Sequence, residues 1–415
     1  MYFIGIDIAK HDHVAAVVDD SGTLCAGPWS FKNDAQGMKE LAVHLAKLKA
    51  QPDKALVAME ATGHYWMATY TSLIDAGWKV AVINPVLIDA YRKTDTLRKT
   101  KTDALDATLI ARFAREKQIC ATGLNPETTD ALKHLTRYRE HLVEEKTMLK
   151  NRCTSLLDRV FPEFASLFSN PFGVTAKALL KYDPTPTGIK TTDIRTLTRI
   201  VVASSHGRFG QAKAKQIKEA ATHSIGVDFA SGALAFEVRH IVELIEYVED
   251  QIGELEEEIA RILDETQGKW LVTIPGIGET LAAQITAEIG APERFAEPSK
   301  LIAYAGLDAT RRQSGKYVGT KEHMSKRGSS HLRRSLMLAA EQVSRKDPYF
   351  KDYYLAKKAE GKHHYVALSG VARKLAGVIL VLMKEQRAYE PRPSIQSSKA
   401  AKTNEKNPEL PIDSL

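Results

Sequence analysis

Short apolar runs and amphipathic stretches alternate from residue 1 to about residue 120. Four runs have the length and composition of buried strands. They are residues 2–9, 14–18, 55–60 and 79–83. A polar turn separates the first two runs, which predicts a hairpin. Helical periodicity follows at residues 35–50 and 65–76 and in a last helix with Asp103, Asp106 and Ile110. Strands with intervening helices indicate an α/β sandwich around a mixed sheet.

The middle of the chain has the pattern of long helices. Residues 128–161 form one amphipathic stretch rich in leucine and charge. A second stretch repeats apolar residues at heptad spacing, which is typical of a coiled coil that Gly253 weakens. Its seam residues are Ile245, Val248, Ile252, Leu255, Ile259 and Ile262. The partner is either the first long helix folded back or another subunit. The Thr-, Pro- and Gly-rich residues 162–226 between the two stretches predict a small helical insert.

The last third reads as a helical domain from residue 269 onward. Residues 274–278, Ile-Pro-Gly-Ile-Gly, are compatible with two interpretations: a helix-hairpin-helix turn that approaches a phosphate, or a plain glycine-rich turn. Residues after 391 have few apolar side chains and predict a disordered tail. We therefore divide the chain into residues 1–125, 126–265, 266–390 and 391–415.

Composition and charge narrow the class of protein. The chain has 415 residues, enough for two or three domains, and its net charge of +7 fits a polyanionic partner. Three scattered cysteines form no metal-ligand pattern and favour a reducing compartment. The apolar run at residues 375–383 is too short to span a bilayer, and no signal peptide is apparent at the N-terminus. We expect a cytoplasmic protein without a membrane partner.

Four carboxylates are the strongest candidates for chemistry. Asp7 lies between isoleucines in a buried strand, where a carboxylate is costly unless a cation or donor compensates it. Glu60 ends another strand, and Asp103 and Asp106 share one face of a helix. Taken alone, Glu60 could cap a turn, and the helical pair could face the helix dipole. Together, two strand-borne acids and a helical pair are typical of a site for hard divalent cations in phosphodiester chemistry.

Two basic segments are candidates for nucleic-acid contacts. One surrounds the acids, with Lys10, Arg92, Arg98, Lys99 and Lys101. The other lies in residues 306–334, where cations crowd the hydroxyls of Ser314 and Ser325; they are Arg311, Arg312, Lys316, Lys326, Arg327 and Arg333. A serine here could be a nucleophile whose transition state these cations stabilise. From the residues alone, a plain basic loop is the stronger interpretation.

Motifs at both ends of the chain resemble one family. Gly5-Ile6-Asp7, then Met59-Glu60-Ala61-Thr62-Gly63, then residues 101–107 look like the first domain of the DEDD insertion-sequence transposases of the IS-one-ten type, which are related to the Piv invertase. Residues 274–278, 303–307, 313–315, 325–328 and 332–333 are similar to that family's second domain. One departure is Ala309, where the family usually has proline. The order of the motifs is more specific than any one of them.

The resemblance implies a DNA transposase or recombinase. Residues 1–125 would be a ribonuclease-H-like (RuvC-like) domain in which Asp7, Glu60, Asp103 and Asp106 bind Mg²⁺. Residues 266–390 would carry the nucleophile, Ser314, with Ser325 as the second candidate. The family further implies a phosphoserine link, donor and target DNA, a bridging guide RNA, and a homo-oligomer, a dimer or tetramer, formed through the coiled coil of residues 126–265.

Three other functions compete with this one. A RuvC-like, structure-selective nuclease would use metal-activated water and no serine. A sugar-kinase or actin-like ATPase also opens with Gly-Ile-Asp, but neither its second phosphate loop nor its adenosine loop is found in the sequence. A non-catalytic nucleic-acid-binding protein with this fold would be favoured by loss of one of the four acids, and all are present.

Overall fold

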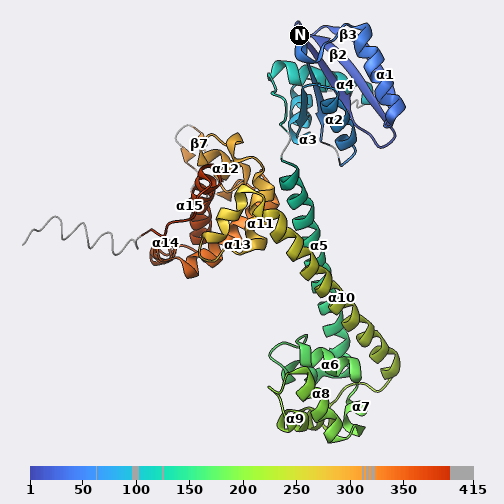
Figure 1. The fold of residues 1–415 in the computed structure, drawn as a ribbon, viewed down its shortest axis with the longest axis vertical. Coiled ribbons are helices and arrows are strands. Elements are labelled where there is room, and N and C mark those ends of the chain that lie inside the picture. Colours follow the sequence, from blue (N-terminus) through green and yellow to red (C-terminus); the bar gives the residue numbers. More distant parts are fainter. Residues whose placement is uncertain are drawn as a thin grey trace, which may run out of the picture. The chain divides into compact units, whose positions relative to one another are not determined.

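The computed structural model describes residues 1–61, 63–95, 102–123, 126–310, 313–314, 317–318 and 323–392, with only the backbone at residues 95, 313, 314, 317 and 318. The chain forms two compact units, Met1–Leu124 and Asn125–Leu415 (Figure 1). The first is a mixed α/β domain and the second is mostly helical, which confirms the coarse fold prediction. The predicted tail falls on residues outside the described part from residue 393 onward.

The N-terminal unit is built around a five-stranded sheet with strand order β3-β2-β1-β4-β5. The first three strands are antiparallel, and β4 and β5 run parallel to β1. The strands are β1 (Tyr2–Asp7), β2 (Asp12–Asp19), β3 (Leu24–Lys32), β4 (Ala55–Glu60) and β5 (Val80–Ile83). The predicted hairpin is therefore confirmed, whereas β3 was missed because only one of its nine residues is buried and it lacks an apolar run.

Helices cover both faces of this sheet (Figure 1). One face packs on α1 (Ala35–Lys47) and α2 (Trp66–Asp75), around Ile4, Ile6 and Leu41. The other packs on α3 (Pro85–Asp95) and α4 (Asp103–Glu116), around Ile88 and Ile110. Alternate residues of β1 point to opposite faces, so a strand that is buried on both sides reads as one continuous apolar run. An acid at the end of such an apolar strand therefore stands out in the sequence.

Two long helices dominate the start of the second unit. They are α5 (Glu127–Val160) and α10 (Ser231–Asp264), 34 residues each. Leu132 of α5 packs with Ile259 near the end of α10, and Leu142 packs with Val248 and Ile252. Ion pairs follow the same antiparallel register, from Arg139–Glu256 to Arg152–Glu237. The heptad residues of α10 therefore face α5 of the same chain, and α10 runs unbroken through Gly253.

Between the two long helices lies the predicted helical insert, with its own core around Phe161, Phe164 and Leu180. Its helices are α6 (Val174–Tyr182), α7 (Pro186–Thr191), α8 (Ile194–Ser204) and α9 (Gln211–Thr222). The buried Lys177 on α6 fastens the insert to α10 through an ion pair with Glu249, 2.7 Å from Nζ to Oε2.

The described residues after α10 form further helices and four two-residue strands, which the sequence did not predict. The helices are α11 (Glu279–Ile289), α12 (Pro298–Tyr304), α13 (Ser330–Lys346), α14 (Pro348–Ala359) and α15 (His364–Glu385). The strands β6 (Ala309–Thr310) and β9 (His323–Met324) pair, as do β7 (Gln313–Ser314) and β8 (Tyr317–Val318).

The apolar run predicted at residues 375–383 belongs to the 22-residue helix α15. Among the described residues, this is the one helix whose length and composition would allow it to cross a membrane. However, 61% of its most apolar window is buried inside the protein, as expected of a core helix.

Candidate active site

The register of two parallel strands brings the first two acids together. Ile6 of β1 pairs with Met59 of β4, so the next residues, Asp7 and Glu60, end neighbouring strands at the same edge of the sheet. Both side chains are half-buried. Because the carboxyl ends of parallel strands meet at one edge, the two carboxylates share the same rim.

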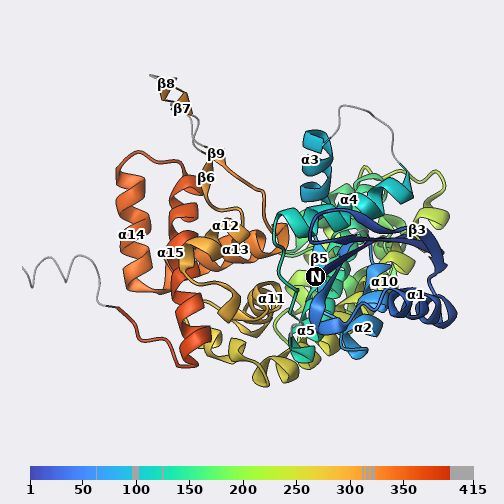
Figure 2. The same cartoon turned by 90° about the horizontal axis from the view of Figure 1, so that it is seen from above.

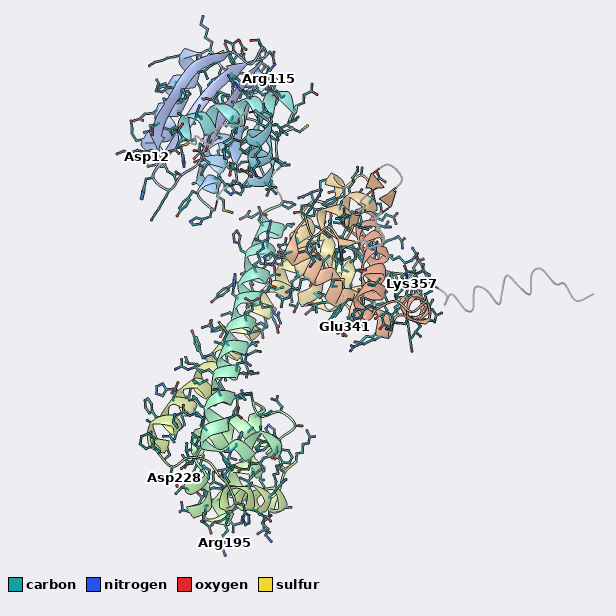
Figure 3. The ribbon with its side chains drawn as sticks, turned by 180° about the vertical axis from the view of Figure 1, so that it is seen from behind. Asp12, Arg115, Arg195, Asp228, Glu341 and Lys357 are labelled. Carbon is teal, nitrogen blue, oxygen red and sulfur yellow. The ribbon has the colours of Figure 1, made fainter. Side chains whose placement is uncertain are left out.

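Helix α4 carries the other two acids toward that rim. Gly5 of β1 lies so close to α4 that a Cβ atom on it would fall 2.1 Å from the carbonyl oxygen of Ala107. At the far end of α4, Arg115 Nε donates to the carbonyl oxygen of Asp20, 2.8 Å away, beside the start of β1. Arg115 and Asp12 accordingly lie at opposite ends of the sheet (Figure 3). The helix therefore runs antiparallel to β1, and its first turn lies toward Asp7.

The two acids of α4 have different surroundings. Thr102 caps the helix by accepting a hydrogen bond from the amide of Leu105, which places Asp103 and Asp106 in the first turn. Asp103 is exposed. Asp106 is buried and forms an ion pair with Arg92 of α3, 2.8 Å from Oδ1 to Nη2. The sequence marked Arg92 as one of the cations near the acids. In the structure, its partner is one of those acids.

The carboxylates have the donor chemistry of a hard-cation site, because Mg²⁺ prefers carboxylate oxygens and keeps several waters or phosphate oxygens as its other ligands. Across the described part of the chain, no three His, Cys, Asp or Glu side chains lie close enough to hold a metal ion by themselves. Asp7 and Glu60, at adjacent strand ends, are the two carboxylates that could share such a cation.

A buried histidine fixes the turn that follows Asp7. His13 accepts a hydrogen bond at Nδ1 from the amide of Ala9, 3.2 Å away, and its Nε2 lies 3.0 Å from the hydroxyl oxygen of Thr69 on α2. Burial lowers the pKa of His13, which keeps the ring neutral and able to accept that bond. The same turn exposes Lys10. The sequence did not assign His13 a role, although a histidine at the start of an apolar strand was a signal.

The serine lies in the small-strand region of the second unit. Ser314 pairs with Tyr317 across the β7–β8 hairpin. The candidate cations Arg311, Arg312 and Lys316 next to it are outside the described residues, as are Arg98, Lys99 and Lys101 near the acids. Of the remaining candidates in this region, Lys326 and Arg327 are exposed, while Arg333 donates to the carbonyl oxygen of Ala305 and so closes the end of α12.

The second candidate serine braces the base of these strands. The Ser325 hydroxyl donates to the carboxylate of Asp308, and the Ser325 amide donates to the Asp308 carbonyl oxygen, 2.8 Å away. Just beyond it, a Cβ atom on Gly328 would fall 1.8 Å from the carbonyl oxygen of Tyr304. The Ser-Lys-Arg-Gly motif is therefore packed tightly against the end of α12.

The glycine-rich turn at residues 274–278 has a structural reason. It joins a 3-10 helix, Gln267–Thr273, to α11, and Gly276 has a φ of +104°. A Cβ atom on Gly276 would lie 3.0 Å from the backbone carbon of Gln342 on α13. The close approach of this glycine is thus to a helix of the same unit, which favours the plain turn over a phosphate-binding hairpin.

Comparison with known proteins identifies both regions. Residues 4–162 match a DEDD transposase family model of the IS110 type, and residues 268–355 match the transposase IS116/IS110/IS902 family. The chain is 27% identical over 396 residues to an uncharacterized protein of insertion element IS110 from Streptomyces coelicolor, covering 94% of this chain and 96% of the relative.

Two other relatives align over nearly their full length. An IS116 insertion-element protein from Streptomyces clavuligerus is 24% identical, with 95% of this chain and 97% of the relative covered. The pilin gene-inverting protein of Moraxella bovis is 23% identical, with 94% and 98% covered. The acids lie in the part matched by the first family model and the serine in the part matched by the second. The chain therefore belongs to the IS110-type transposases and recombinases, and it is a DNA recombinase by class.

Proposed function

We propose that this insertion-sequence recombinase cuts and rejoins DNA strands through a phosphoserine link on Ser314, with Mg²⁺ held by Asp7, Glu60, Asp103 and Asp106. The observation that carries the proposal is the register of β1 and β4, which puts Asp7 and Glu60 at adjacent strand ends. An antiparallel β1–β2–β3 meander followed by two parallel strands also supports a ribonuclease-H-like, RuvC-like domain.

The metal part of the proposal depends on the chemistry of the sheet edge. Asp7 and Glu60 are the primary ligands, with Asp103 near the rim and Asp106 held in place by Arg92. When bound, the cation neutralises charge on the scissile phosphate and orients it. Arg92 supplies the buried Asp106 carboxylate with a partner 2.8 Å away, as a buried acid requires.

The covalent step belongs to the serine. Ser314 Oγ attacks the phosphorus, an O–P bond to Ser314 forms, and the bond to the leaving sugar oxygen breaks. The serine proton leaves to solvent, and the sugar oxygen takes up a proton. In the second half, a sugar hydroxyl attacks the phosphoserine and releases Ser314. The two steps exchange one phosphodiester for another without ATP, as strand exchange requires.

Ser314 is the better candidate of the two serines because of what Ser325 already does. The Ser325 hydroxyl is committed to Asp308 at the base of β6 and β9, where it stabilises the region that presents the β7–β8 hairpin. If the Ser325–Asp308 hydrogen bond has this structural role, Ser325→Ala should weaken the hairpin and lower activity without removing the covalent step.

The partners in this proposal are donor and target DNA, a guide RNA and further copies of the chain. The exposed cations Lys10, Lys326 and Arg327 are positioned as phosphate contacts. An oligomer formed through the long helices would use their outer faces, because Val248, Ile252 and Ile259 are buried against α5 of the same chain. Sequencing RNA that co-purifies with the protein tests the guide: an RNA from the flanking element supports it, and nonspecific RNA contradicts it.

The decisive experiment traps the covalent intermediate. Labelled donor DNA is incubated with the recombinase and Mg²⁺, and protein–DNA adducts are separated in denaturing gels. We expect an adduct with the native protein and with Ser325→Ala, and none with Ser314→Ala. Cleavage that persists in Ser314→Ala would instead indicate the alternative function, a RuvC-like, structure-selective nuclease that uses metal-activated water.

A further inference from the structure

Helix α14 presents two tyrosines among cations from three elements. Tyr349 and Tyr353 lie one turn apart on this helix, which packs beside α15 (Figure 2). Lys374 of α15 places its Nζ 4.9 Å from the ring centre of Tyr353 and 6.0 Å from that of Tyr349. The Arg392 guanidinium lies 5.5 Å from the centre of Tyr349, and Lys357, labelled in Figure 3, lies 5.9 Å from that of Tyr353.

A cavity of about 420 Å³ opens beside the first tyrosine. Its lining includes Tyr349, Lys374, Arg387 and Arg392, together with Gly377 and Val378 of α15. The volume falls in the range of about 300–1,000 Å³ that is typical of small-molecule pockets. A lining that combines a flat aromatic side chain, apolar residues and cations matches a nucleobase with its phosphate.

Buried hydrogen bonds fix the segment that closes this cavity. Tyr389 follows α15, and its hydroxyl donates to Asp347 Oδ2 over 2.9 Å; both residues are buried. Asp347 also caps α14 by accepting from the amide of Phe350. The Tyr389 amide donates to the hydroxyl oxygen of Thr273, 2.8 Å away. The same carboxylate thus starts the helix that bears Tyr349 and anchors the segment that bears Arg392.

The cations around the cavity differ in whether an acid neutralises them. Arg387 is paired with Glu385 at 2.5 Å, and Lys357 is paired with Glu360 at 2.8 Å. Lys374 and Arg392 form no ion pair with any residue in the described part of the chain, and Glu390 is the single acid of the lining. Two cations beside Tyr349 therefore keep their full charge for an anionic ligand.

We propose that this pocket binds an unpaired base of a single-stranded nucleic acid, with the base on Tyr349 and the flanking phosphates on Lys374 and Arg392. The proposal rests on the proposed function for the presence of nucleic acid and adds a contact outside the catalytic residues. Bases stack on aromatic rings largely without regard to sequence, and nearby cations bind the backbone. A stacked base takes the place of one cation over the ring, and that cation moves to the phosphate.

The test compares three fluorescent ten-nucleotide ligands of equal length and backbone charge: oligo-U RNA, oligo-dT DNA and an abasic strand. The full-length protein is expected to bind at least one base-bearing strand more tightly than the abasic strand. Tyr349→Leu, which keeps apolar volume, should lose that preference by roughly 5- to 100-fold. Tyr349→Phe should retain it. Lys374→Gln and Arg392→Gln should weaken the binding of all three strands, the abasic strand included.

The controls separate this site from the rest of the protein. Lys351→Gln removes an exposed cation from the same helix outside the cavity and should bind like the native protein. Equal affinity of Tyr349→Leu and native protein for base-bearing strands would overturn the pocket proposal. Cleavage that persists in Asp7→Asn would overturn the proposed function while leaving the pocket measurement intact, so the two failures are distinguishable. Preference for RNA or for DNA identifies which strand the pocket holds.

Discussion

Asp7 and Glu60 end strands that are paired along their whole length within a five-stranded sheet, whereas Ser314 lies in a strand of two residues that pairs with another strand of two. The carboxylates are held by buried strands and by a helix in contact with Gly5. The serine depends on a hairpin whose base is fixed by Ser325 and Asp308. The proposed catalytic residues thus fall into a rigid half, the carboxylates of the sheet, and a second half, Ser314 on a strand of two residues.

The difference suggests how each half does its work. A metal site requires carboxylates that stay in place, and the sheet supplies that. The proposed serine nucleophile has a different task, because it would have to reach two different strand ends in turn. The start of α13, four residues after Ser325, is anchored by the buried Glu288 of α11, which accepts from the hydroxyl of Ser329 and from Arg137 of α5, 2.7 Å away.

The largest effect should come from removing a carboxylate of the rigid half. We expect Asp7→Asn to lower strand cleavage at least roughly a thousandfold, about 4 kcal/mol of transition-state stabilisation, because the proposed cation loses a charged ligand. The chain should still fold, since asparagine has nearly the same shape. Cleavage of labelled donor DNA at saturating Mg²⁺ measures the loss.

A matched acid at the other end of the neighbouring strand provides the control. Asp53 precedes β4 and is exposed, whereas Glu60 ends that strand at the proposed site. Asp53→Asn should leave cleavage unchanged. If Asp7→Asn and Asp53→Asn behaved alike, the sheet edge would have no catalytic role, and the comparison between the two halves would fail.

The rigid half was also the half that the sequence predicted well. Continuous apolar runs predicted β1, β4 and β5. An acid at the end of such a run has few structural explanations, which predicted a functional role for it. The parallel pairing of β1 with β4, which makes Asp7 and Glu60 neighbours, came only from the structure. The sequence also left out the pairing of Arg92 with Asp106, because a cation 14 residues before an acid gives no sign that the two side chains will meet.

A second prediction tests whether the rigidity comes from the contact between β1 and α4. A Cβ atom on Gly5 would fall 2.1 Å from the Ala107 carbonyl oxygen and 2.5 Å from the Ala111 amide, so Gly5→Ala must push α4 outward. We expect the free energy of unfolding to fall by roughly 1–3 kcal/mol and the cleavage rate to fall with it. Urea unfolding followed by tryptophan fluorescence reports mainly on this unit, which contains Trp29, Trp66 and Trp78, whereas the second unit contains Trp270.

Gly27 in β3 is the control for this substitution because a Cβ atom added there would have nothing within 4 Å. Gly27→Ala should change stability by less than about 0.5 kcal/mol. A Gly5→Ala variant as stable and as active as Gly27→Ala would show that α4 is not held by this contact. The position of Asp103 and Asp106 would then need another explanation.

The second unit was harder to predict for a physical reason. Its long helices were visible because their apolar residues repeat over many turns, but β6 to β9 are two residues each and show no periodicity. A heptad pattern shows that α10 has an apolar face but not which helix covers it. Here α5 covers it because the insert reverses the direction of the chain between the two helices. Ser314 was found through a family motif, and the pocket beside Tyr349 was not found at all, because its parts come from α14, α15 and the segment after α15.

The smallest predicted effect concerns the anchor of that pocket. Burial and the hydrogen bond to Asp347 raise the pKa of Tyr389 above its ordinary value of about 10. Below that ordinary value both folded and unfolded chains keep the proton, so the stabilisation is fully present. As the pH rises beyond it, the unfolded chain releases the proton first, and the stabilisation is lost. Tyr389→Phe should cost about 1 kcal/mol near pH 8 and progressively less above about pH 10.

The urea midpoints of native protein and Tyr389→Phe should therefore converge between about pH 8 and about pH 11. Circular dichroism at the helical minimum follows the second unit, which holds most of the helix. Parallel curves would mean that the Tyr389 hydroxyl is not held by Asp347 in solution. In that case no hydrogen bond would hold the segment with Arg392 beside Tyr349. Converging curves would instead show that Asp347, the carboxylate that caps α14, also holds this side of the pocket.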